Sequence, residues 1–152
     1  MRTILIILGM IFLIIIVLVA TMIGVTAVKG SALDKESKAY VDSVVPRIVS
    51  NWDESELLSR ASSEFMQATD KQELDKLYTL FRKLGKLRVY EGSKGQSYIS
   101  MTIQNGKSVT AVYTCKADFD AGPADIKVSL IQHGGRWEVA GFNVDSEVFL
   151  RH

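Results

Sequence analysis

Hydrophobic residues follow one another without interruption in the first part of the chain, before any periodic pattern begins. From Thr3 to Val28, 26 consecutive residues carry no charge, and most of them are Ile, Leu or Val. A helix rises about 1.5 Å per residue, so about 20 apolar residues are enough to cross the ~30 Å hydrocarbon core of a bilayer. The pattern predicts a transmembrane signal anchor over residues 1–29 and an extramembrane domain over residues 30–152.

The main alternative for this segment is a cleaved signal peptide that ends at the small residues 25–27. The hydrophobic region of a signal peptide is usually about 7–15 residues long, much shorter than this run, which favours the anchor. The Lys and Arg residues at positions 29–47 mildly favour a cytoplasmic domain, whereas a span that begins after Arg2 is typical of a signal anchor that exports the domain after it. We predict a single-pass protein of the cytoplasmic (inner) membrane with a periplasmic domain.

The next part of the chain has apolar residues at spacings of three and four, which is typical of amphipathic helices. A first helix is predicted over Ser31–Trp52, with a kink or break at Pro46, because proline removes a backbone donor. A second helix opens at Asp53, which is a favourable N-cap residue. A third opens at residue 69 or 70 and ends at Gly85, a typical helix stop.

After this glycine the pattern changes to strict alternation of apolar and polar residues, which predicts β-strands. We expect five strands, separated by four turns at residues 92–95, 105–106, 120–123 and 134–135. Asn105-Gly106 is the strongest hairpin signal, because both turn positions need a positive φ. In the last strand the apolar phase changes around Gly141, which predicts a β-bulge there.

Helices followed by strands indicate an α+β fold rather than a parallel α/β sheet. A sheet with one apolar face must cover that face, and the three helices are the elements available to do so. The predicted fold class is a single N-terminal transmembrane helix followed by three helices packed on a curved five-stranded antiparallel sheet.

Charge and composition exclude several classes of function. Beyond residue 29 the chain holds 16 Lys and Arg against 17 Asp and Glu, so we expect no nucleic acid partner, which would need a basic excess. The lone Cys115 excludes an internal disulfide framework and a zinc site built from cysteines. His133 and His152 have no second histidine at ligand spacing. We therefore expect neither a metal nor a cofactor.

The predicted inward positions of the strands are almost all apolar. General acid–base catalysis needs a titratable group in a cleft, and only Tyr113 and Cys115 could be considered there. A cysteine in the middle of an apolar strand face is expected to be buried and to behave as a small hydrophobic residue. We therefore expect no catalytic residues and no enzymatic activity.

Three sets of residues are candidates for binding. Small residues share one face of the predicted span, where another membrane helix could approach closely: Ala20, Gly24 and Ala27. Tyrosine, threonine and valine on the predicted outward sheet face suit a protein interface: Tyr90, Tyr98, Thr102, Thr110, Val112 and Thr114. Inward side chains could line an apolar, cone-shaped pocket: Phe81, Tyr113, Cys115, Phe119, Trp137 and Phe142.

The closing element Gly135–Phe142, in which Gly-x-Trp-x-Val leads into the last strand, resembles the final hairpin of NTF2-like and cystatin-like domains. The resemblance covers roughly Ser31 to Phe149 and implies helices packed into the concave side of an antiparallel sheet. The layout is also similar to small membrane-anchored proteins of unassigned function and to certain cytochrome oxidase assembly proteins. Enzymes of the NTF2-like group carry an Asp, His or Tyr set inside the cone, and this chain lacks the Asp and His.

Three functions remain open at this point. The first is a non-enzymatic accessory or assembly subunit of a membrane complex, which binds another membrane protein or associates with itself. The second is the binding of a small molecule or lipid in the apolar pocket. The third is an enzyme that uses Tyr113 or Cys115, and a fully buried Cys115 would argue strongly against it.

Overall fold

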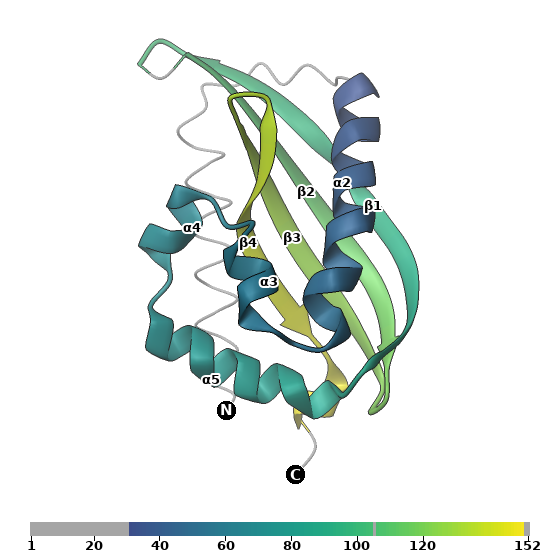
Figure 1. Cartoon of the computed structure of the whole chain (residues 1–152). Helices are drawn as coiled ribbons and strands as arrows, with labels where there is room; N and C mark the ends of the chain where they lie inside the picture. Colours follow the sequence, from purple (N-terminus) through teal and green to yellow (C-terminus); the bar gives the residue numbers. More distant parts are fainter. Residues whose placement is uncertain (1–30, 105, 151–152) are drawn as a thin grey trace.

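The computed structural model describes residues 31–104 and 106–150 of the 152-residue chain. Helical elements come first, and strands joined by short connections come after them (Figure 1). The elements are α2 (Ser31–Ser50), α3 (Glu54–Leu58), α4 (Ser63–Ala68), α5 (Lys71–Phe81), the short 3₁₀ helix η1 (Arg82–Leu84), β1 (Leu87–Thr102), β2 (Gly106–Phe119), β3 (Pro123–His133), β4 (Arg136–Asp145) and the 3₁₀ helix η2 (Glu147–Leu150). The α+β class is therefore as expected.

The strands form one antiparallel sheet in the order β1-β2-β3-β4, so each strand pairs with its neighbours in sequence. The sheet is strongly curved, and the helices lie on its concave side, with α2 along β1 and α5 across the lower end (Figure 1). We refer to the side that faces these helices as the inner face of the sheet and to the opposite side as the outer face.

The core lies between the helices and the inner face. The predicted inward residues of two strands are all buried, which confirms their phase: Val109, Ala111, Tyr113, Cys115, Ala117 and Phe119 in β2, and Ile126, Val128 and Leu130 in β3. On the helical side, one stripe of α2 is buried against them, formed by Val41, Val44, Val45, Ile48 and Val49. Burial of these apolar side chains is what holds the helical layer on the sheet.

The sheet has four strands rather than the five predicted. Residues 92–95, which the sequence suggests as a turn, lie within β1, a continuous strand of 16 residues. The pairing with β2 shifts between Tyr90 and Ser93, so the glycine at 92 belongs to a β-bulge and not to a turn. Gly95 instead allows β1 to approach β2 closely, because a Cβ at this position would collide with the Val112 carbonyl oxygen and the Tyr113 ring.

The helical region also differs in its divisions. α2 continues through Pro46 without a break and ends at Ser50. The second predicted helix is two short ones, because Ser62 caps α4 by accepting a 3.1 Å hydrogen bond from the Phe65 amide. Between α3 and α4, Ala61 forms an isolated parallel bridge with Val139 of β4, which requires extended rather than helical backbone.

The predicted fold class needs a second correction, which concerns the membrane span. In the described part of the chain, no helix is both long enough and apolar enough to cross a bilayer. α2 has 20 residues, but charged side chains recur along it from Asp34 to Arg47. The span predicted within residues 3–28 lies outside the described residues. The absence of such a helix among the described residues contradicts two predictions: that of a transmembrane single-pass protein, and that of an inner-membrane location with a periplasmic domain.

Two turn features agree with the prediction. β3 and β4 are joined by Gly134-Gly135, both with positive φ, as a tight hairpin requires. The bulge predicted near Gly141 is present, since the register shifts where Ser129 pairs with Gly141 and Leu130 with Val139. Asn105 lies outside the described residues, but β1 and β2 pair from Thr102 and Gly106 onward.

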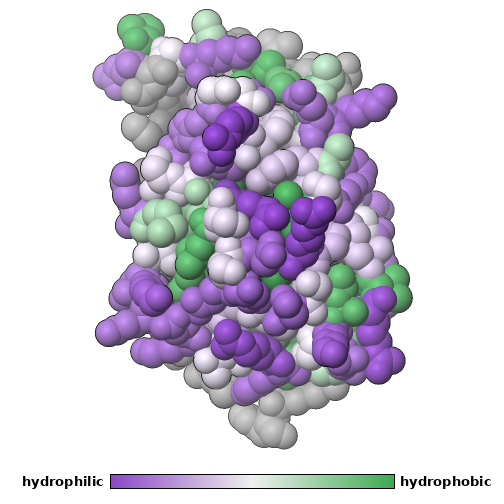
Figure 2. Space-filling model, in the orientation of Figure 1, coloured by the Kyte–Doolittle hydropathy of each residue, from purple (hydrophilic) through white to green (hydrophobic). Residues whose placement is uncertain are grey.

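Viewed from the helical side, the surface is mostly hydrophilic, with small hydrophobic patches (Figure 2). Among the described residues, five large hydrophobic side chains are exposed: Met66, Val89, Met101, Ile103 and Leu150. They come from different elements, although Met101 and Ile103 both lie near the β1–β2 hairpin tip.

Candidate functional site

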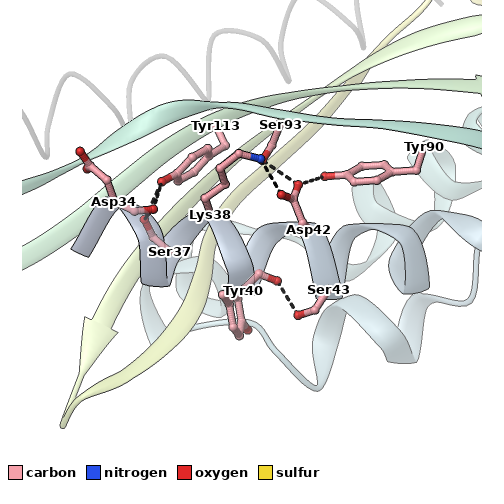
Figure 3. Close-up of polar contacts among 9 residues, drawn as sticks. All are labelled: Asp34, Ser37, Lys38, Tyr40, Asp42, Ser43, Tyr90, Ser93 and Tyr113. Atoms are coloured by element: carbon pink, nitrogen blue, oxygen red, sulfur yellow. Dashed lines mark hydrogen bonds and ion pairs between the residues drawn. The ribbon is translucent and has the colours of Figure 1, made fainter. Parts of the chain in front are cut away.

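A polar cluster fastens the sheet-facing side of α2 to β1 (Figure 3). We name it the Asp42 cluster; it consists of Lys38 and Asp42 from α2 and Tyr90 and Ser93 from β1. The hydroxyls of Tyr90 and Ser93 each donate to Oδ1 of Asp42 at 2.7 Å. The Lys38 ammonium donates to the other carboxylate oxygen at 2.6 Å. The carboxylate therefore has donors on both of its oxygens.

The electrostatics of the Asp42 cluster favour a stable charge pair over a reactive group. Burial alone would raise the pKa of Asp42, but the hydrogen bonds from Lys38, Tyr90 and Ser93 hold that pKa below its usual value. Burial raises the pKa of Tyr90, and the adjacent Cys115 and Asp42 add to the rise. A carboxylate with a lowered pKa is a weak base and cannot activate Ser93 as a nucleophile at neutral pH.

A second polar group joins the start of α2 to the sheet. The Ser37 and Tyr113 hydroxyls lie 2.6 Å apart, and the Tyr113 hydroxyl donates to the Asp34 carbonyl at 2.9 Å. The Asp34 carboxylate accepts hydrogen bonds from both the backbone N–H of Ser97, at 2.7 Å, and the Ser97 hydroxyl. Ser37, Ser97 and Tyr113 are nearly fully buried, so these bonds satisfy groups that would otherwise be costly.

Cys115 pairs with Ser93 of the Asp42 cluster in the β1–β2 ladder and is fully buried. Burial raises the pKa of its thiol to about 11. A thiol in this state is a poor nucleophile at neutral pH, because the thiolate is the reactive form.

The six residues predicted to line a pocket occupy different places. Phe81, Phe119 and Phe142 belong to a packed aromatic group that also contains Trp52, Tyr78 and Phe149. Tyr113 and Cys115 lie beneath α2, in the contacts described above. Trp137 is only half-buried and lies at the start of β4, away from this aromatic group.

The structure places most, but not all, residues of the predicted interaction face on the outer face of the sheet. Tyr98 pairs with Thr110 and Gln96 with Val112, which places these side chains on the outer face of the sheet, and Thr102 and Thr114 lie at the same phase. Tyr90 is not among them, because the bulge at 92–93 turns its side chain inward to Asp42. The stripe Ala20, Gly24 and Ala27 lies outside the described residues.

His133 has a partner that the sequence did not indicate. Its Nε2 atom lies 2.9 Å from Oε1 of Glu64, across the surface between the β3–β4 hairpin and α4. Both side chains are exposed, so this pair contributes little to stability. The structure groups no three His, Cys, Asp or Glu side chains at metal-binding spacing in the part of the chain it describes.

A surface depression of about 310 Å³ lies between α2, the residues just after α3, and the start of β4. We name it the β4-edge depression; its lining residues are Tyr40, Ser59, Arg60, Arg136, Trp137 and Glu138. Tyr40 projects from α2 away from the Asp42 cluster (Figure 3). Burial raises the pKa of its phenol, opposed by the nearby Arg60 guanidinium.

The lining of the β4-edge depression combines aromatic, cationic and acidic side chains. The indole N–H of Trp137 is buried and has no hydrogen-bond partner among the described residues, which is uncommon for a buried polar group. Arg60 is bonded to the side chain of Glu56 at 2.7 Å, whereas Arg136 forms no ion pair with the described residues. Glu138 is the one carboxylate in the lining. Sequence reasoning missed this site, because its residues come from three distant segments.

The edge of β4 borders this depression. The Val139 amide donates to the Arg60 carbonyl at 2.8 Å, and the Ser62 amide donates to the Val139 carbonyl at 2.8 Å. The backbone groups of Val139 therefore point away from β3. Because backbone direction alternates along a strand, the N–H and C=O of Trp137, two residues earlier, point the same way.

No known protein-family model matches this sequence, and no curated protein is significantly similar to it.

Proposed function

We propose that this domain is a non-enzymatic protein-binding module that acts as an accessory or assembly subunit of a larger complex. The observation that carries the proposal is the β4-edge depression. There, two aromatic rings, two guanidinium groups and an outward-pointing strand edge lie together, beside a buried indole N–H that has no partner among the described residues. Tryptophan, tyrosine and arginine are the residues that most often dominate the energy of protein interfaces.

The state of the other polar groups supports a binding role over catalysis. Asp34, Asp42 and Tyr113, which could carry acid–base chemistry, are hydrogen-bonded between α2 and the sheet. The Cys115 thiol is buried with its pKa raised to about 11. These groups hold the fold together, and none of them lines the β4-edge depression.

Site-specific crosslinking would test the proposal. A photo-reactive amino acid is placed at Ser59, which is exposed at the rim of the depression, and in a matched variant at Tyr98 on the outer sheet face. Each full-length chain is irradiated in its native cells, purified in a mild detergent and studied by native mass spectrometry. We expect a stoichiometric crosslinked partner, or a second copy of the chain, from position 59.

Crosslinks from position 98 alone would move the binding surface to the outer sheet face and contradict the assignment to the depression. A chain that stays uncrosslinked and monomeric from both positions would contradict the binding function itself.

A further inference from the structure

The β4-edge depression also indicates what kind of partner segment it accepts. We propose that it binds an extended peptide segment bearing a carboxylate, which adds to the edge of β4 at Trp137. This inference rests on the proposed protein-binding function and specifies the chemistry of the bound segment.

The backbone geometry supports the addition of a strand. Among the described residues, the bridge between Ala61 and Val139 is the one pairing on this edge of β4. The chain that forms it turns away toward α3 at Arg60 and Ser59, which line the depression. The next outward-pointing backbone groups, those of Trp137, therefore face the depression. An incoming extended segment can pair with them and continue the ladder past Val139, as in β-strand addition.

The side chains select the charge of the segment. The Tyr40 hydroxyl and the Arg136 guanidinium can both donate hydrogen bonds to a ligand, and Arg60 adds a second cation that is shared with Glu56. A carboxylate only accepts hydrogen bonds, so it complements this lining, and its bonds to a guanidinium are among the stronger ones in proteins. Glu138 repels a segment with several acids in a row, which favours a single carboxylate.

The size and walls of the depression fit a short segment. A volume of about 310 Å³ lies at the lower end of the range for ligand sites, and it suits a few side chains rather than a whole domain. The rings of Tyr40 and Trp137 supply apolar contact area at little entropic cost. A segment of alternating β-branched residues with one Asp meets both demands.

Titration by NMR tests the inference directly. The full-length, ¹⁵N-labelled chain in a mild detergent is titrated with the peptide Ac-Val-Thr-Val-Asp-Val-NH2. Two matched peptides serve as controls: one carries Asn in place of Asp, and one is N-methylated so that its backbone cannot donate. We expect saturable shifts of the Trp137 indole and backbone N–H signals with the first peptide, and at least tenfold weaker binding of both controls.

Variants assign the charge contact. Arg136→Gln should reduce binding of the Asp peptide to the level of the Asn peptide, while Arg47→Gln, an exposed arginine elsewhere on α2, should leave binding unchanged. The inference is overturned by the absence of saturable shifts at millimolar peptide, by equal binding of the three peptides, or by shifts that avoid Trp137. If the peptide results contradict the inference while position 59 still crosslinks a stoichiometric partner, the binding function stands. Only the proposal that the bound segment is extended and carries a carboxylate is then wrong.

Discussion

The indole nitrogen of Trp52 donates a 3.0 Å hydrogen bond to the backbone carbonyl of Gly85, so a residue just beyond α2 is tied to the glycine that ends η1. Trp52 has a φ of 55°, a left-handed conformation that costs a non-glycine residue about 1–2 kcal/mol. Its ring packs against Phe81 and Phe119, with centroids 5.3 and 5.4 Å away. These contacts and the hydrogen bond offset the backbone strain.

The two tryptophans therefore predict different outcomes for the same substitution. Trp52→Phe should lower the free energy of unfolding by about 1–3 kcal/mol, because it leaves the Gly85 carbonyl without its donor. Trp137→Phe should lower it by less than Trp52→Phe does, since the Trp137 indole N–H has no partner to lose among the described residues and only ring area packed against the core is removed. Urea unfolding of both variants, followed by circular dichroism, measures the difference. Equal losses would contradict the assigned roles.

Asp42 predicts a stability that depends on pH. Its pKa is lower in the folded chain than in the unfolded one, so its contribution is present above the unfolded value of about 3.9 and is lost as the pH falls through the folded value. Asp42→Asn should therefore be less stable than the parent at pH 7, and the difference should shrink below about pH 4. Chemical unfolding across this pH range tests the point.

The control for this experiment is Asp145→Asn, which removes an exposed carboxylate at the end of β4. Its unfolding curve at pH 7 should match that of the parent, because among the described residues this exposed side chain makes no hydrogen bond to α2 or β1 that the substitution would remove. A gap between Asp42→Asn and the parent that stays constant down to about pH 2 would show that the carboxylate charge is not what stabilises the cluster.

Cys115 should resist alkylation in the folded chain. With a pKa of about 11, roughly one thiol in a thousand is ionised at pH 8, against about a quarter for a free cysteine. Burial slows the reaction further. Iodoacetamide labelling, read out by mass spectrometry, should be at least about a hundredfold slower in buffer than in urea. Comparable rates in both would mean that the thiol is accessible in the folded state.

Gly95 is predicted to tolerate no side chain. Gly95→Ala would place a Cβ against the Val112 carbonyl and the Tyr113 ring, so we expect a loss of about 1–3 kcal/mol or more. Lys94→Ala, at the exposed neighbouring position, should change the free energy of unfolding by less than about 0.5 kcal/mol. Thermal unfolding separates the two, and similar midpoints would contradict the close approach.

Structural features that depend on a short stretch of sequence could be predicted correctly. The inward phase of β2, the helix start predicted at residue 69 or 70 and the bulge at Gly141 each depend on a few consecutive residues, and the structure confirms them, with Asp70 as the cap. The prediction of a fifth strand is wrong. The sequence does not distinguish a glycine that permits a β-bulge, as Gly92 does, from one that forms a turn. That error also inverted Tyr90, since one extra residue in a strand reverses the side chains that precede it.

The β4-edge depression could not be found in the same way. Tyr40, Arg60 and Arg136 are placed together only when α2 packs on the sheet and Ala61 bridges to Val139. Neither event leaves a periodic or short-range trace, because both depend on contacts between distant segments.

Different kinds of group meet the outward-pointing backbone at the two edges of the sheet. At β1, the outward N–H of Ser97 is met by the Asp34 side chain, which cannot lead another backbone into register. At β4, the outward groups of Val139 are met by backbone atoms, and no pairing of Trp137 on this edge is present among the described residues. Growth of a fibre requires each copy to both receive a strand and offer one. The Ser97 donor on the β1 edge is therefore not available to the backbone of a second copy.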